Sequence, residues 1–252
     1  MNPAVEWKNV SKIYPDGHRA LDGITLQVVK GEALALLGTS GSGKTTLLKT
    51  VNRLIEPTHG EILVRGQSTT SWDPIALRRS IGYVIQEAGL MPHLDCLENV
   101  GLVPRLRGMG RRERDTIAEQ RLHLVGLDPA RFALLRPHQL SGGQRQRVGV
   151  ARALAAEPDL ILMDEPFGAL DPITRREIQS EFRELRRRLG TTVILVTHDV
   201  REAALVADRI ALMDAGKIVQ EGRAAEVLAN PVNDFARAFF ADAQAVSIAE
   251  AG

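Results

Sequence analysis

The chain has 252 residues, of which 44% are hydrophobic and 25% charged, a composition typical of a globular protein with one or two domains. Its formal net charge is +1, from 32 basic and 31 acidic residues. This balance creates no overall basic field and argues against nucleic acid as a partner. The single cysteine, Cys96, cannot form an internal disulfide, which fits a reducing compartment.

The N-terminal residues 1–8 lack the apolar stretch of a secretory signal. The longest apolar runs, such as residues 33–37 and 160–163, fall far short of the roughly 18 residues needed to cross a bilayer. We therefore expect the chain to be cytoplasmic and to reach a membrane only through a partner.

Strand-like segments near both ends of the chain predict antiparallel strands. Val5 and Trp7 alternate with polar residues, and a turn at residues 214–217 separates two short apolar segments. The two segments on either side of this turn are residues 210–213 and 218–219, and residues 24–29 and 61–65 are also strand-like.

Three short, almost purely apolar runs have the pattern of strands buried on both faces of a parallel sheet. They are residues 33–37, 160–163 and 193–196. Helical patterns lie between them, for example apolar positions at spacings of four, three and four in residues 178–189. Strands that alternate with helices predict an α/β fold with a mainly parallel sheet.

The middle of the chain, roughly residues 87–157, shows no convincing strand. Residues 111–126 and 142–156 have helical patterns, and the second ends before Pro158. We interpret this region as a helical subdomain inserted into a main domain of residues 1–222. Residues 223–252 are expected to form one or two short helices followed by a loose, alanine-rich end.

Residues 38–45 match the phosphate-binding pattern G-x-x-x-x-G-K-[ST], after a buried strand and before a helix. Glycines let backbone N–H groups face phosphate oxygens, while Lys44 would bind the outer phosphates and Thr45 would bind Mg²⁺. The alternative is an ordinary glycine-rich turn. The candidate nucleotide ligands are Gly38, Thr39, Ser40, Gly41, Ser42, Gly43, Lys44, Thr45 and Thr46.

Two carboxylates, Asp164 and Glu165, end the buried run at residues 160–163. A phosphate-binding loop needs a carboxylate near Mg²⁺ and a group that activates water. Asp164 is the candidate for the metal and Glu165 the candidate general base. The alternative is a strand end that happens to carry two acids.

Three further residues are candidates because of their positions after strand-like segments. His198 ends the run at residues 193–196 and could reach the terminal phosphate, or it could cap the next helix. Gln86 could complete the Mg²⁺ or water contacts. Tyr14 offers an aromatic face for adenine, and the alternative for this ring is packing in the core.

A second motif, residues 140–144, reads Leu-Ser-Gly-Gly-Gln at the start of a predicted helix. It resembles the signature sequence of ATP-binding cassette (ABC) proteins, and the other candidate residues follow in the order of that family. The resemblance implies a P-loop NTPase core with an antiparallel β subdomain and a helical subdomain, and it implies ATP and Mg²⁺ as cofactors. Its nucleotide contacts would include Ser141, Gly142, Gly143, Gln144 and, in the loop of residues 169–171, Asp171.

In this family the signature of one subunit closes on the nucleotide held by another. One phosphate loop and one signature per chain therefore imply a head-to-tail dimer, most simply a homodimer, in which Ser141 and Gly143 contact ATP across the interface and Asp171 couples the two sites. Family members of this kind bind integral membrane permeases on the cytoplasmic face of the membrane and act indirectly with an extracytoplasmic solute-binding protein.

Residues 81–93 and 165–175 resemble, more finely, the ATPase subunits of importers for glycine betaine, choline, carnitine or proline. Because the chain ends at Gly252, we expect no paired regulatory domain of the cystathionine-synthase type.

An importer for another small solute, such as an amino acid or sulfonate, is the main alternative. A soluble ABC ATPase that acts on DNA or ribosomes and a P-loop kinase are the others, and the kinase would leave residues 140–144 unexplained.

Overall fold

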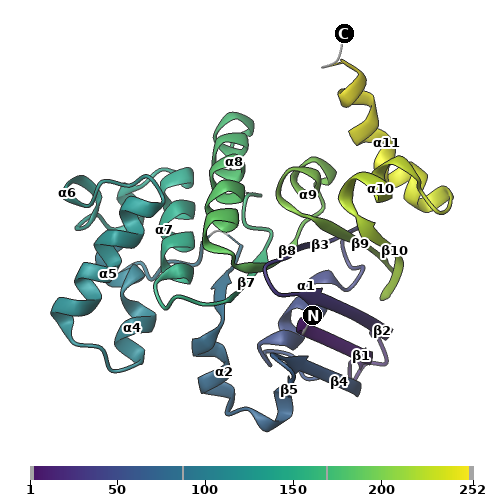
Figure 1. Ribbon diagram of the computed structural model, residues 1–252, viewed down its shortest axis with the longest axis horizontal. Coiled ribbons are helices and arrows are strands. Elements are labelled where there is room, and N and C mark those ends of the chain that lie inside the picture. Colours follow the sequence, from purple (N-terminus) through teal and green to yellow (C-terminus); the bar gives the residue numbers. More distant parts are fainter. Residues whose placement is uncertain (1–2, 87, 169, 250–252) are drawn as a thin grey trace. The chain divides into compact units, whose positions relative to one another are not determined.

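A computed structural model describes residues 3–86, 88–168 and 170–249 (Figure 1). The chain divides into two compact units. The first unit comprises Met1–Trp72 and Thr192–Gly252, and the second comprises Asp73–Thr191. The domain boundaries expected from the sequence remain predictions, and residue 87, where the helical subdomain was expected to begin, lies outside the described residues.

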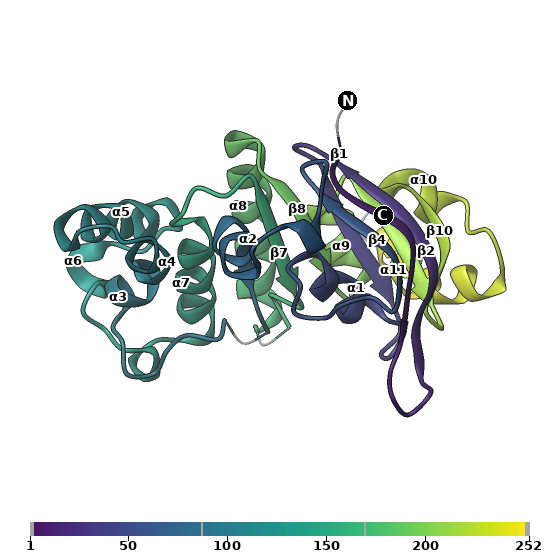
Figure 2. The ribbon, with the colours of Figure 1, turned by 90° about the horizontal axis from the view of Figure 1, so that it is seen from below.

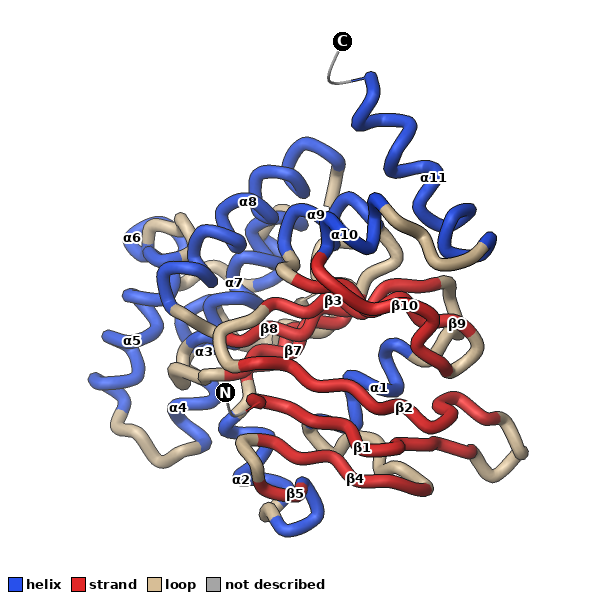
Figure 3. The backbone as a smooth tube through the Cα atoms, turned by 45° about the vertical axis from the view of Figure 1, so that its right-hand side comes forward, coloured by secondary structure: helices blue, strands red, loops and turns tan. Residues whose placement is uncertain are grey.

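The first unit contains an antiparallel sheet with the strand order β2-β1-β4-β5. Trp7 pairs with Leu26 on one side and Ile62 on the other, and all three side chains are buried. Figure 3 shows β1, β2 and β4 side by side. The strands are β1 (Pro3–Ile13), β2 (Arg19–Val29), β4 (His59–Val64) and β5 (Gln67–Ser68), and the short helix η1 (Thr69–Ser71) follows.

The first unit also contains strands in the order β10-β9-β3-β8. Strand β3 (Ala33–Gly38) pairs in parallel with β8 (Thr192–Val196) and β9 (Arg209–Asp214), and every residue of β3 and β8 is buried. β9 pairs antiparallel with β10 (Lys217–Arg223). Helices α1 (Lys44–Val51) and α9 (Val200–Val206) contact β3 from opposite sides (Figure 3). The apolar runs of the sequence therefore form a covered parallel core, as predicted.

The C-terminal part of the first unit packs on this sheet through α10 (Ala224–Ala229) and α11 (Asp234–Ala249). Phe240 and Val227 join Leu37 in one buried cluster. The sequence analysis expected one or two short helices here, and the structure has two, of which α11 continues through Ala249. Alanine has the highest helix propensity, which favours this continuation.

The second unit contains β6 (Gly82–Val84) paired in parallel with β7 (Leu160–Asp164). Helix α7 (Gly142–Leu154) contacts β6 and three other helices of this unit (Figure 2). Both helices expected from the sequence are present, and shorter ones join them. The other helices are α2 (Pro74–Ser80), α3 (Cys96–Val100), α4 (Leu102–Leu106), α5 (Arg111–Leu124), α6 (Pro129–Phe132), η2 (Pro137–Gln139) and α8 (Pro172–Leu189).

None of the helices in the described ranges combines the length and the apolar character that a membrane span requires.

Replacing Leu36 with alanine tests the buried parallel core. Leu36 is 0% exposed, so its truncation removes apolar contacts and leaves a cavity. We expect the free energy of unfolding to fall by about 2–5 kcal/mol, measured by denaturant unfolding. The matched control, Leu54→Ala, changes a side chain that is 49% exposed and should shift stability by less than about 0.5 kcal/mol. Equal losses in the two variants would contradict this description of the core.

Candidate functional site

The loop between β3 and α1 turns at two glycines that lie against neighbouring backbone. Gly38 has a φ of 147°, and a Cβ atom there would lie 2.2 Å from the carbonyl oxygen of Met213. Gly43 has a φ of 100°, and its Cβ would lie 2.4 Å from the carbonyl oxygen of Ala20. A larger residue at either position would displace backbone, so the loop shape requires both glycines.

The side chain of Lys44 folds back into this loop. Its Nζ donates hydrogen bonds to the carbonyl oxygens of Gly38 at 2.9 Å and Thr39 at 2.7 Å, and the residue is only 5% exposed. Thr39 and Ser40 are exposed, and no acidic residue occupies the first turn of α1. The loop therefore presents a held ammonium group and the positive end of a helix, which together favour an anion.

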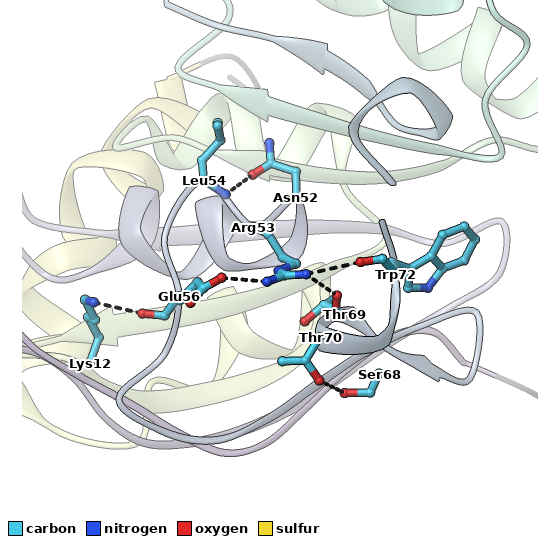
Figure 4. Close-up of polar contacts among 9 residues, drawn as sticks. All are labelled: Lys12, Asn52, Arg53, Leu54, Glu56, Ser68, Thr69, Thr70 and Trp72. Atoms are coloured by element: carbon cyan, nitrogen blue, oxygen red, sulfur yellow. Dashed lines mark hydrogen bonds and ion pairs between the residues drawn. The ribbon is translucent and has the colours of Figure 1, made fainter. Parts of the chain in front are cut away.

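The opposite end of α1 is fastened by Arg53 (Figure 4). Its Nη1 donates to the carbonyl oxygens of Thr69 and Trp72, each at 3.2 Å, and its Nη2 donates to Glu56 at 2.7 Å. These bonds tie the chain after α1 to helix η1. Sequence analysis gave Arg53 no role, because the two partners that lie far from it in the chain are backbone carbonyl groups, which leave no mark in the sequence.

His198 lies at the same end of the parallel strands as the loop. Leu36 of β3 pairs with Val196 of β8, and Gly38 and His198 each come two residues later. Asp199 caps α9 by accepting from the N–H groups of Arg201 at 2.8 Å and Glu202 at 3.2 Å. Asp199 is thus the N-cap of α9, and His198 is exposed beside it. The phosphate contact of the histidine stays a prediction.

Tyr14 lies at the end of β1 and is half-buried. Its ring stacks on His18 with a centroid separation of 6.2 Å and an interplanar angle of 11°. The Nζ of Lys12 lies 5.3 Å from the ring centroid. The ring is therefore not part of the core, and its role toward adenine stays a prediction.

In the second unit, Gln86 and Glu165 follow paired strands. Val84 of β6 pairs with Met163 of β7, so both residues emerge at one end of these strands. Gln86 is exposed. Glu165 has a φ of 46°, a left-handed conformation that is uncommon for a side chain of this size and concentrates at functional positions.

Asp164 has a neighbour that sequence analysis did not single out, Tyr83 of β6. The Tyr83 hydroxyl is buried and has no hydrogen-bond partner among the residues that the structure describes. Burial, followed by the charge of the Asp164 carboxylate, raises the pKa of Tyr83 well above its usual value. The phenol therefore stays neutral beside the carboxylate that ends β7.

The signature residues form the N-terminus of α7. Ser141 is the N-cap, with its Oγ accepting from the N–H of Gln144 at 3.2 Å, and the side chain of Gln144 accepts from the N–H of Ser141 at 2.9 Å. A Cβ at Gly143 would lie 2.7 Å from the side chain of Thr174. The capping box thus fixes the start of the helix and leaves the first-turn N–H groups of Gly142 and Gly143 outside the intrahelical ladder.

Asp171 caps α8, where its carboxylate accepts from the N–H of Thr174 at 3.1 Å. Pro172 occupies the first turn, a position where proline loses no helical hydrogen bond. Hydrogen bonds from Thr174 lower the pKa of Asp171 below its ordinary value. Ala169, in the same expected motif, lies outside the described residues.

The structure thus groups the candidate residues by unit. The phosphate loop, Tyr14 and His198 belong to the first unit. The second holds Gln86, Asp164, Glu165, Ser141, Gly142, Gly143, Gln144 and Asp171. Across the described ranges there is no cluster of three or more His, Cys, Asp or Glu side chains that could hold a metal ion by itself.

Comparison with known families decides which protein family this is. The profile of the ABC transporter family matches residues 21–168, which include the phosphate loop and the signature. The chain belongs to the ABC transporter family. This confirms the resemblance that the two motifs indicated.

Several relatives of this ABC protein have curated names. The glycine betaine/carnitine/choline transport ATP-binding protein OpuCA of Bacillus subtilis (strain 168) is 51% identical over 232 residues, which are 92% of this chain and 61% of the relative. The osmoprotectant import ATP-binding protein OsmV of Salmonella typhimurium is 48% identical, over 88% of this chain and 58% of the relative. The glycine betaine uptake system ATP-binding protein YehX of Escherichia coli is 46% identical, over 94% of this chain and 76% of the relative. The chain thus spans about three fifths of the first two relatives.

Solved structures confirm the predicted fold class. The dimeric, post-hydrolysis structure of the ATP-binding cassette MJ0796, bound to ADP and Pi, matches with a TM-score of 0.78 and 39% identity over 87% of this chain and 98% of that chain. The structure of cbiO1 from Clostridium perfringens, part of the ABC transporter complex cbiONQ, matches with a TM-score of 0.83 and 29% identity. The match covers 91% of this chain and 92% of that chain.

The Asp171 cap should show a specific pH dependence. The pKa of Asp171 is lowered on folding from an ordinary value of 3.8, so the carboxylate stabilises the fold fully above that value and loses its contribution as the pH falls through the lowered pKa. We expect Asp171→Ala to lower Tm near neutral pH and the difference from the unsubstituted chain to shrink below about pH 4. Asp171→Asn, whose amide oxygen can also cap, is the control and should show a much smaller change with pH. A pH-independent effect of Asp171→Ala would contradict the capping role of the carboxylate.

Proposed function

We propose that this chain is the ATP-hydrolysing subunit of an ABC importer for quaternary-amine and related osmoprotectants, such as glycine betaine, choline, carnitine or proline. One observation supports the proposal most strongly. A phosphate loop and an ABC signature occur on one chain that is 51% identical to a relative named for glycine betaine, carnitine and choline transport.

The phosphate loop would hold the nucleotide. Its glycines bring backbone N–H groups close to an anion, and Lys44 already lies inside the loop, where it would exchange carbonyl partners for the outer phosphates. Thr45 and Thr46 follow Lys44 in the first turn of α1, and their N–H groups belong to the positive end of that helix. Tyr14 would stack on adenine through its partly exposed ring.

Mg²⁺ fits the oxygen donors that the chain provides. Hydroxyl, amide and carboxylate oxygens from Thr45, Gln86 and Asp164 are ligands that Mg²⁺ accepts, and it usually takes only one or two carboxylates beside phosphates and water. The lack of a larger acidic cluster in the described ranges agrees with such a site. The bound ion would neutralise charge on the outer phosphates as hydrolysis proceeds.

Glu165 would act as the general base that takes a proton from the attacking water. Its left-handed backbone is an uncommon conformation of the kind that concentrates at functional positions, which supports a catalytic role. His198 would contact the terminal phosphate from the end of β8.

The signature would complete the site of a second copy. Its N–H groups at Gly142 and Gly143 and the hydroxyl of Ser141 form a further anion-binding surface at a helix N-terminus. Since the phosphate loop already holds one nucleotide, a head-to-tail homodimer would use both surfaces, as the dimeric relative suggests. Ser141 and Gly143 would contact ATP across the interface, Gln144 would hold the cap, and Asp171 would link the two sites.

The remaining partners follow from the transport role. An importer of this kind requires integral membrane permease subunits, on which the dimer would sit at the cytoplasmic face, and it receives solute indirectly from an extracytoplasmic binding protein. The relatives' names describe ATP-binding proteins of glycine betaine, carnitine and choline transport and of osmoprotectant import.

The substitution Glu165→Gln tests hydrolysis and dimerisation together. Glutamine is close in size to glutamate but cannot accept the proton, so we expect kcat to fall by about 10²-fold or more. ATP should still bind, and a dimer with trapped ATP should elute in size-exclusion chromatography with Mg²⁺. Lys44→Met, which removes the phosphate contact, is the control and should remain monomeric under the same conditions. Sustained hydrolysis together with a monomer in Glu165→Gln would reject this mechanism.

Uptake of labelled glycine betaine, choline, carnitine and proline tests the solute class. Cells that lack this chain should lose uptake of at least one of the four, and the unsubstituted chain should restore it while the Lys44→Met variant should not. Unchanged uptake of all four solutes would reject the osmoprotectant assignment without affecting the ATPase assignment.

A further inference from the structure

The segment after Gln86 turns sharply in a way that its own backbone does not favour. Ala88 has a φ of 63° and Gly89 a φ of 51°, so two successive residues are left-handed. A Cβ at Gly89 would lie 2.1 Å from the side chain of Ile85. Ala88 is buried at 1% exposure. A turn of this kind persists only where its surroundings hold it.

Arg152, near the C-terminus of the signature helix α7, holds this turn. Its Nη1 donates to the carbonyl oxygen of Gly89 at 2.8 Å, and its Nη2 donates to that of Ala88 at 2.7 Å. Burial lowers the pKa of Arg152, yet an arginine in a protein stays protonated, so both bonds come from a charged donor. A lysine could not reach two carbonyl groups in the same fixed geometry.

Gly149 brings α7 against the same turn. It precedes Arg152 by three residues and therefore lies on the same helix face. A Cβ at Gly149 would lie 3.0 Å from the Cβ of Ala88. The helix can approach the turn this closely only because position 149 has no side chain.

Asn99 on α3 fastens the other end of this segment. It is 0% exposed, and its Oδ1 accepts from the N–H of Met91 at 2.8 Å. Its Nδ2 donates to the carbonyl oxygens of Met91, Leu94 and Asp95. Residues 88–95 are thus held by one helix at each end, so they cannot shift freely as a loose loop would.

We propose that Arg152, with Gly149, is a positioning residue that couples Gln86 to the signature. The rigid α7 carries Ser141 at its N-cap and Arg152 about 16 Å along the helix. A displacement of the signature end, when it meets nucleotide on a second copy, moves the turn at residues 88–89 and with it Gln86. This inference rests on the proposed function.

The variants separate positioning from folding. Arg152→Met removes both hydrogen bonds, Arg152→Lys retains the charge, and Gly149→Ala pushes on Ala88 while leaving the arginine in place. Arg107→Met is the matched control, because Arg107 also donates to two backbone carbonyls in the second unit, but to those of Arg79 and Ala156 and not to those of residues 88 and 89.

We expect kcat for ATP hydrolysis to fall about tenfold in Arg152→Met, with KM changed less than twofold, because the phosphate loop itself is untouched. Arg152→Lys and Gly149→Ala should show smaller losses of the same kind, and Arg107→Met should match the unsubstituted chain. In a Gln86→Ala background, Arg152→Met should cause almost no further loss, since the arginine acts through that residue. Amide hydrogen exchange should rise at residues 88–91 in Arg152→Met.

Two results would overturn the coupling: equal effects of Arg152→Met and Arg107→Met, or fully additive losses with Gln86→Ala. If Arg152→Met does not fold, Arg152→Lys and Gly149→Ala decide by the same comparisons. If the unsubstituted chain hydrolyses no ATP, the proposed function fails. Amide hydrogen exchange in Arg152→Met then tests whether Arg152 holds the turn. Unchanged exchange at residues 88–91 would show that it does not.

Discussion

The close packing of glycine backbone against neighbouring carbonyl groups holds the nucleotide loop in its shape. Gly38 lies against the carbonyl of Met213 on β9, and Gly43 lies against that of Ala20 on β2. Lys44 then donates to carbonyl oxygens inside the loop. The loop therefore depends on strands far away in the sequence, and the parallel core must be in place before the loop can take a form that suits an anion.

The second unit uses the same principle at its own turning point. The chain after Gln86 bends through two left-handed residues, and α7 supports the bend with a missing side chain at Gly149 and a buried guanidinium at Arg152. The same helix begins at the capped signature. One end of α7 therefore carries the signature, and the other end holds the turn that follows Gln86. The proposed mechanism uses both of these parts.

Much of this arrangement could be predicted from the sequence. The buried runs became β3, β7 and β8, and the helices expected at residues 111–126 and 142–156 are α5 and α7. Short helices such as α3 and α6 were not predicted, because one turn shows no periodicity. The positions of Tyr83 and Arg53 were not singled out, because the partners that surround each side chain come from other segments of the chain.

The sequence by itself determined the family and the candidate residues, because the phosphate loop and the signature are local patterns with fixed spacing. Only the tertiary structure decided that Asp199 caps α9, and that Arg152 holds carbonyl groups 63 and 64 residues away. Backbone carbonyls are present in every residue, so which of them a guanidinium meets is set by packing and not by residue type.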